Sequence, residues 1–66
     1  MFIDLTFQDN NSPVRVNTDF ITHYYASNSG EYTNIVMVTG SVIHVSESYS
    51  EVTCKIKDVR EFHGRI

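Results

Sequence analysis

TNIVMVTGSVIHVSESYSEV, the stretch from Thr33 to Val52, decides the fold because its hydrophobic period changes once along its length. Its first half is rich in β-branched residues, which favour strands, and is interrupted only by a turn at Gly40. After Val45 the apolar residues recur every three or four positions, which is the period of a helix. The stretch therefore predicts a β-hairpin followed directly by a helix.

The turn at Gly40 can be worked out from which residues must share a face of the sheet. Cross-strand partners lie on the same face, and a two-residue loop would pair odd positions with even ones. A three-residue loop with Gly40 in the left-handed conformation instead places Ile35 and Met37 on the face of Ile43 and Val45. We therefore expect the three-residue loop.

The helix is predicted to begin with a capping box. In Ser48-Tyr49-Ser50-Glu51 the Ser48 hydroxyl can accept from the Glu51 N–H, while the Glu51 side chain reaches back to the cap. The spacing then predicts an amphipathic helix over about residues 49–62, ending before Gly64. Its apolar stripe, which should pack on the sheet, comprises Tyr49, Val52, Ile56 and Val59.

The N-terminal half has the pattern of three further short strands. Ile3, Leu5 and Phe7 alternate with polar residues, and polar turns follow at Asp9–Pro13, Asn17–Asp19 and Ser27–Gly30. The predicted strands cover about residues 1–8, 14–17, 20–26, 32–39 and 42–46. The expected fold is mainly β (α+β): a small antiparallel five-stranded meander or partly open barrel, closed by one C-terminal amphipathic helix.

A chain of 66 residues is expected to form a single domain that is too small for the cleft of an enzyme. In a chain this short, apolar burial at about 25 cal/mol per Å² only roughly offsets the ordering entropy. Some supplement to the core is therefore expected. Cys54 is the single cysteine, so no disulfide can form within the chain, and a lone thiol fits a reducing compartment. Self-association is the expected supplement.

The net charge of −3 disfavours nucleic acid as a partner, because phosphate binding needs Lys and Arg to displace counterions. Four of the five basic residues do lie near the C-terminus, so a salt-sensitive nucleic-acid contact there is a third-ranked hypothesis: Lys55, Lys57, Arg60 and Arg65. The sequence contains no run of about 20 apolar residues, so no membrane span is predicted. Its start also lacks the pattern of a signal peptide. A cytoplasmic protein is expected.

The residue types that commonly carry chemistry are explained more simply by structure. The candidate zinc ligands are His23, His44, Cys54 and His63. Structural zinc ligands usually come in close pairs, whereas these four residues are widely spaced in the sequence. We therefore expect no bound metal, and no other cofactor. Cys54 lacks a base and a pocket and is expected to be a small, partly buried filler. Glu47 and Glu51 fit helix capping and the helix dipole rather than a catalytic pair. The loop at residues 27–30 lacks a phosphate-binding pattern.

One feature resists a purely structural explanation. If Ile35 and Ile43 face the helix, alternate residues of the same strands face away from it, and that face is unusually apolar for a solvated sheet. We expect a second copy or a partner protein to cover it, and name as interface candidates Val36, Val38, Val42, His44, Tyr24 and Phe20. The alternative is that the sheet curls enough to bury both faces within one chain.

Two parts of the sequence also resemble a known family. The run Ile35-x-Met37-x-x-Gly40-x-x-Ile43-x-Val45-x-Glu47-Ser48-x-x-Glu51-Val52, and the preceding Leu5-Thr6-Phe7 and Val14-x-Val16-Asn17-x-Asp19-x-Ile21, are similar to small flagellar and swarming-motility proteins of the FlbD/SwrD type. The resemblance spans roughly residues 3 to 56. It implies a non-enzymatic protein with relatives in motility and among short phage reading frames. This chain differs in its apolar Val36, Val38 and Val42.

These observations predict a non-catalytic protein-interaction module that forms a homo-oligomer and binds an unidentified protein partner, with a motility role implied by the resemblance. The alternative is a phage-encoded anti-defence protein, located in the host cytoplasm, that blocks a host protein or sequesters a ligand. Gene neighbourhood separates the two hypotheses.

Overall fold

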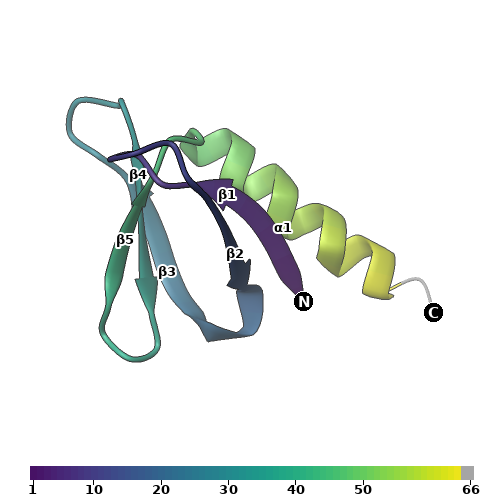
Figure 1. Ribbon diagram of the computed structural model, residues 1–66. Helices are drawn as coiled ribbons and strands as arrows, with labels where there is room; N and C mark the ends of the chain where they lie inside the picture. The colour runs from purple at the N-terminus through teal and green to yellow at the C-terminus, as the bar shows by residue number, and fades with distance from the viewer. Residues whose placement is uncertain (65–66) are drawn as a thin grey trace.

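The computed structural model describes residues 1–64, with side chains described for residues 1–59. It has five strands, one 3-10 turn and one C-terminal helix (Figure 1). In chain order these are β1 (Phe2–Thr6), β2 (Pro13–Asn17), η1 (Thr18–Phe20), β3 (Ile21–Ala26), β4 (Thr33–Met37), β5 (Val42–Val45) and α1 (Tyr49–Gly64). All five predicted strands and the helix are confirmed; several strands are shorter than predicted, and the helix continues through Gly64.

The first hairpin pairs β1 with β2 and contributes its apolar face to the core. Ile3 lies opposite Val16 and Leu5 opposite Val14, so the alternating residues of both strands point the same way. Ile3, Leu5 and Val16 are buried. The turn between the strands places Asn11 at φ 58°, a left-handed conformation that asparagine tolerates better than most residues.

The strands divide into a two-stranded sheet, β1–β2, and a three-stranded sheet, β3–β4–β5, which are not closed into a barrel. The polar corner after β2 causes the division. The Asn17 side chain accepts a hydrogen bond from the Asp19 N–H at 3.0 Å and caps η1, which turns the chain away from β2 before β3 begins. Consecutive strands β2 and β3 therefore do not pair.

The far end of β1 instead lies against β5. Phe7 and Val45 form an isolated antiparallel bridge. Around it the Ser46 N–H donates to the Thr6 carbonyl at 2.8 Å, and the Gln8 N–H donates to the His44 carbonyl at 3.0 Å. The two sheets are thus joined by backbone hydrogen bonds at one corner.

The hairpin from β4 to β5 has the three-residue loop predicted from face sharing. The Gly40 N–H donates to the Met37 carbonyl at 2.9 Å, and the Met37 N–H donates to the Ser41 carbonyl at 2.8 Å. Gly40 has φ 91°, which only glycine adopts without strain. Ile35 consequently lies opposite Ile43, as expected.

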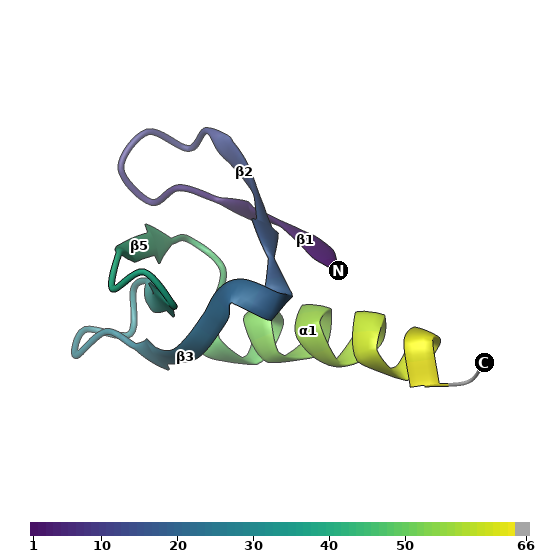
Figure 2. The same ribbon diagram turned by 90° about the horizontal axis from the view of Figure 1, so that it is seen from below.

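The helix begins with the predicted capping box. The Glu51 N–H donates to the Ser48 hydroxyl at 3.1 Å, and the Ser48 N–H donates to the Glu51 carboxylate at 3.3 Å. Figure 2 shows α1 running beside both sheets, and it packs mainly on β1 and β3. Its inward face fills a core whose buried apolar members are Ile3, Leu5, Val16, Ile35, Val45, Val52 and Ile56.

Candidate functional site: the outer face of the three-stranded sheet

The face of β3–β4–β5 that points away from α1, termed the outer face, is defined by the strand register. Ile35 and Val45 are fully buried on the inner face, so alternate residues of β4 and β5 point outward. Two rows cross the outer face, with members paired in register. The first row is Tyr25, Asn34 and His44, and the second is His23, Val36 and Val42.

Polarity changes from one end of the outer face to the other. The first row, next to the loop between β3 and β4, is polar and aromatic. The second row contains two valines, and beyond it Val38 lies beside Phe20, whose carbonyl accepts from the Val38 N–H at 2.7 Å. The exposed fractions of Phe20, Val38 and Val42 are 54%, 56% and 46%. The turn end of the face therefore leaves large apolar side chains in water.

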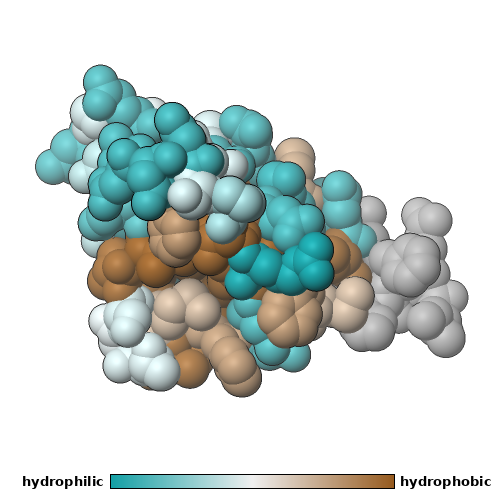
Figure 3. Space-filling model, in the orientation of Figure 1, coloured by the Kyte–Doolittle hydropathy of each residue, from teal (hydrophilic) through white to brown (hydrophobic). Residues whose placement is uncertain are grey.

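The outer face carries no formal charge, because none of the residues of β3, β4 and β5 is Asp, Glu, Lys or Arg. The sheet β1–β2 differs in this respect. There the Arg15 Nε donates to the Asp4 carboxylate at 2.9 Å, which raises the pKa of Arg15. Figure 3 shows polar side chains over the upper part of the view of Figure 1 and an apolar band below them.

Side-chain contacts order the polar end of the outer face. His44 Nδ1 lies 2.6 Å from Asn34 Oδ1, and the Tyr32 ring meets the His44 imidazole edge-on with centroids 5.1 Å apart. The His23 and Tyr25 rings stack with centroids 6.1 Å apart. The two sets are neighbours across the sheet, because Tyr25 pairs with Asn34, and together they border a hollow.

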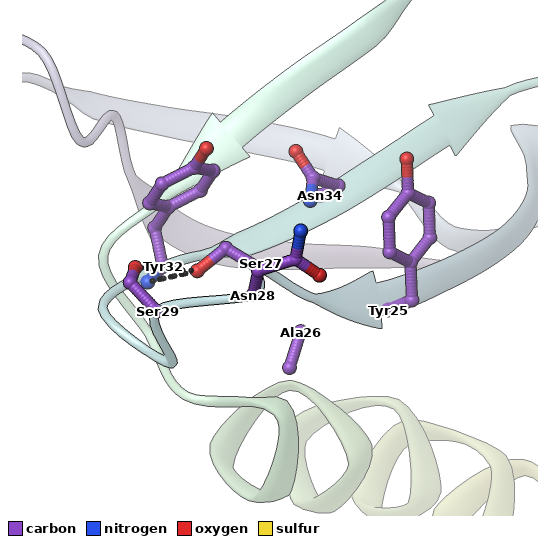
Figure 4. A pocket seen from close by; sticks show the side chains of 7 residues that line it. All are labelled: Tyr25, Ala26, Ser27, Asn28, Ser29, Tyr32 and Asn34. Atoms are coloured by element: carbon purple, nitrogen blue, oxygen red, sulfur yellow. Dashed lines mark hydrogen bonds between the residues drawn. The ribbon is translucent and has the colours of Figure 1, made fainter.

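The hollow has a volume of about 500 Å³ and lies where β3 passes through its loop into β4. It is lined by Tyr25, Ala26, Ser27, Asn28, Ser29, Tyr32 and Asn34. In Figure 4 the two tyrosine rings stand at opposite sides of the hollow, with the amides of Asn28 and Asn34 between them. The lining is therefore aromatic and amide-rich, without a charged side chain.

The structure brings most of the predicted interface residues together. Val36, Val42 and His44 lie on the outer face, and Val38 and Phe20 are adjacent at its turn end. The placement of Tyr24 was wrong. Its hydroxyl lies 2.9 Å from the Thr53 hydroxyl of α1, and its ring lies 5.2 Å from that of Tyr49.

A bulge in β3 explains the error. The register shifts between Ile21 and His23, after which Tyr24 lies opposite Ile35 on the inner face. Three further residues of the outer face were not predicted from the sequence: Tyr25, Tyr32 and Asn34. The last two share the face of Val36 by simple alternation along β4, so the signal was present in the sequence.

Two further expectations are corrected on the helix and just before it. Cys54 is exposed rather than partly buried, because Val52 and Ile56 take the inward positions on either side of it. Glu47 does not cap the helix: its carboxylate accepts from the Thr6 N–H at 2.8 Å and from the Thr6 hydroxyl at 2.9 Å. Of the two glutamates, Glu51 takes part in the capping box, together with Ser48.

Among the described residues, no three His, Cys, Asp or Glu side chains are grouped in a way that could hold a metal ion. The side chains of Arg60, His63 and Arg65 lie outside the described part, so their predicted roles are not tested. Within residues 1–64 no helix has the length and apolar character needed to cross a membrane.

The resemblance to small flagellar and swarming-motility proteins stays a prediction based on the sequence pattern. A scan against models of protein families, a search of curated proteins and a search of solved structures each find no match to this chain.

Proposed function

We propose that this protein is a non-catalytic interaction module that self-associates through the outer face of β3–β4–β5. The observation that carries the proposal is the uncharged sheet face with Val38, Val42 and Phe20 about half exposed at one end. Val38 of the β4–β5 turn is hydrogen-bonded to Phe20 of η1, and Val42 pairs with Val36, so these apolar residues gather at one end of the sheet, whereas isolated exposed apolar residues are ordinary.

A second copy of the chain is the occupant that fits this surface best. Each copy has a net charge of −3, so a contact that brought the acidic groups of two copies together would be repulsive. The outer face avoids such a contact, since its strands contain no acidic or basic residue. Charged residues are also depleted in the centres of protein interfaces. A two-fold arrangement would place the patch of one copy against the same patch of the other.

The small size of the core gives self-association a further physical reason. A domain of 66 residues buries only about 60% of the surface of its unfolded chain, which leaves its stability marginal. Val38 and Val42 each retain about half of their surface in water. Burying the remainder in a dimer contributes roughly 1 kcal/mol for each side chain.

The proposal is tested by measuring molar mass with light scattering and sedimentation over a wide range of concentration. We expect a mass above that of one chain at micromolar concentration, and a monomer for Val42→Glu. Phe2→Glu is the matched control, because Phe2 is similarly exposed (58%) but lies on β1, away from the outer face. A native chain that stays monomeric throughout contradicts the proposal, as does equal dissociation by both variants.

The cellular role of such a module is a separate part of the proposal. We propose a motility-linked partner on the strength of the sequence resemblance, and a phage-encoded inhibitor of a host system as the alternative. Flagellar genes beside the reading frame would support the first role. Phage structural genes or a defence island beside it would support the second.

A further inference from the structure

We propose that the hollow between β3 and β4 is a binding site for an uncharged nucleobase, with an adenine-type base as the preferred ligand. The hollow lies at the polar end of the outer face, opposite the end where Val38 and Phe20 are exposed. Its volume of about 500 Å³ falls within the range of small-molecule sites. The proposal goes beyond self-association and does not depend on it.

Aromatic side chains give the hollow a surface for stacking. Tyr25 is 49% exposed, and its ring is held by stacking on His23. Tyr32, on the other side of the hollow, is half-buried and held by its edge contact with His44. Bases stack on tyrosine in many binding modules, and rings that are already held in place lose little entropy when a ligand binds.

The amides between the two tyrosines supply the hydrogen-bonding groups that a base edge needs. Asn34 is only 7% exposed, and its Oδ1 is engaged by His44 Nδ1 at 2.6 Å. This contact fixes the amide, whose nitrogen then remains as the donor that Asn34 can offer. Asn28 is exposed and can offer both a donor and an acceptor. Adenine presents a neighbouring donor and acceptor, which asparagine matches well.

The same loop argues against a phosphate as the recognised group. Three of its N–H groups are used within the loop. The Gly30 N–H donates to the Ser27 carbonyl at 3.0 Å, and the Tyr32 N–H donates to the Ser27 hydroxyl at 3.4 Å. The Glu31 N–H donates to the Ser29 hydroxyl at 3.3 Å. No Lys or Arg lines the hollow, and Glu31 in the loop repels anions. The site therefore favours a base or nucleoside over a nucleotide.

The test is a titration of the ¹⁵N-labelled full chain with adenosine, followed by backbone amide shifts. We expect saturable shifts centred on Tyr25, Asn28, Tyr32 and Asn34, with a dissociation constant in roughly the millimolar range that suits a shallow, open site. Adenosine 5′-monophosphate should bind more weakly than adenosine, and methyl glucoside should produce no saturable shifts.

Variants separate base stacking from general surface effects. Tyr25→Ala should weaken adenosine binding about tenfold or more, whereas Tyr25→Phe should retain it, because stacking needs the ring and not the hydroxyl. Asn28→Ala should weaken binding several-fold. Phe2→Ala, an exposed aromatic residue of β1 outside the lining of the hollow, should leave it unchanged. The amide spectrum of each variant reports whether it is folded.

Three outcomes would overturn the proposal. These are the absence of saturable shifts at the hollow, tighter binding of the monophosphate than of the nucleoside, and equal binding of methyl glucoside. The two proposals fail separately, because measurements of molar mass report self-association, whereas amide shifts of the lining residues report adenosine binding.

Discussion

The carboxylate of Glu47 holds Thr6 by two hydrogen bonds, from the Thr6 N–H at 2.8 Å and from its hydroxyl at 2.9 Å. The residues are far apart in the sequence, and the contact ties the end of β1 to the segment that precedes α1. On the same segment the Thr33 hydroxyl donates to the Glu47 carbonyl at 2.8 Å, which adds β4 to the junction. Glu47 therefore connects both sheets to the start of the helix.

Replacing Glu47 with Ala should lower the free energy of unfolding by about 2 kcal/mol, because a partly buried N–H and hydroxyl lose a charged acceptor. Urea denaturation followed by circular dichroism measures the change. Glu31→Ala is the control, since Glu31 lies exposed in the loop between β3 and β4 and should change stability little. Equal effects of the two substitutions would refute the structural role of Glu47.

Ser48→Ala should destabilise the protein by about 1 kcal/mol, because the helix loses the hydroxyl that accepts from the Glu51 N–H. Thermal melting provides the measurement, and a fall of several degrees is expected for a domain of this size. The neighbouring Ser50→Ala is matched in chemistry and lies in the first turn, but it removes no cap. A melting temperature lowered as much by Ser50→Ala as by Ser48→Ala contradicts the capping assignment.

Gly40→Ala should lower the free energy of unfolding by about 1 kcal/mol through backbone strain alone. A Cβ at this position meets no atom within 4 Å, so the cost arises from φ 91° and not from a clash. Gly40→Asn should cost less than Gly40→Ala, since asparagine tolerates left-handed conformations better than alanine does. Chemical denaturation of the two variants gives the comparison, and a reversed order would contradict the conformational explanation.

Tyr24→Phe and Tyr25→Phe test which tyrosine faces the helix. Tyr24→Phe should destabilise the protein by about 1 kcal/mol, because the Thr53 hydroxyl, which itself donates to the Tyr49 carbonyl, loses the Tyr24 hydroxyl as its donor. Tyr25→Phe should leave stability nearly unchanged, because Tyr25 is on the outer face with its side chain half exposed. Denaturation midpoints measured side by side decide between them, and the opposite order would restore the face originally predicted for Tyr24.

Local patterns in the sequence predicted the elements because each depends on neighbouring residues. The capping box involves Ser48 and Glu51, and the turn at Gly40 follows from the faces of its flanking strands. The bulge before His23 could not be seen in this way, because it is a property of how β3 aligns with β4. The contact between Glu47 and Thr6 was equally out of reach, since it depends on how the two sheets meet.

The same distinction applies to the candidate site. The apolar turn end of the outer face was predicted from alternation along β4 and β5. The hollow was not predicted, because Tyr25 and Tyr32 are placed on its two sides by a loop whose shape depends on hydrogen bonds within it. Alternation along β4 did place Asn34 on the face of Val36, but it could not show that Asn34 is nearly buried with its amide held by His44.

The bridge between Phe7 and Val45 joins the first hairpin to a strand that is synthesised much later. The first hairpin is complete in sequence at Asn17, yet the backbone groups at its far end acquire their partners only at His44 and Ser46. A nascent chain that has not yet reached Ser46 holds an unfinished strand edge. The N-terminal hairpin is therefore synthesised first, but its hydrogen bonds to β5 form last. We expect the domain to fold in one cooperative step after its C-terminal third has left the ribosome.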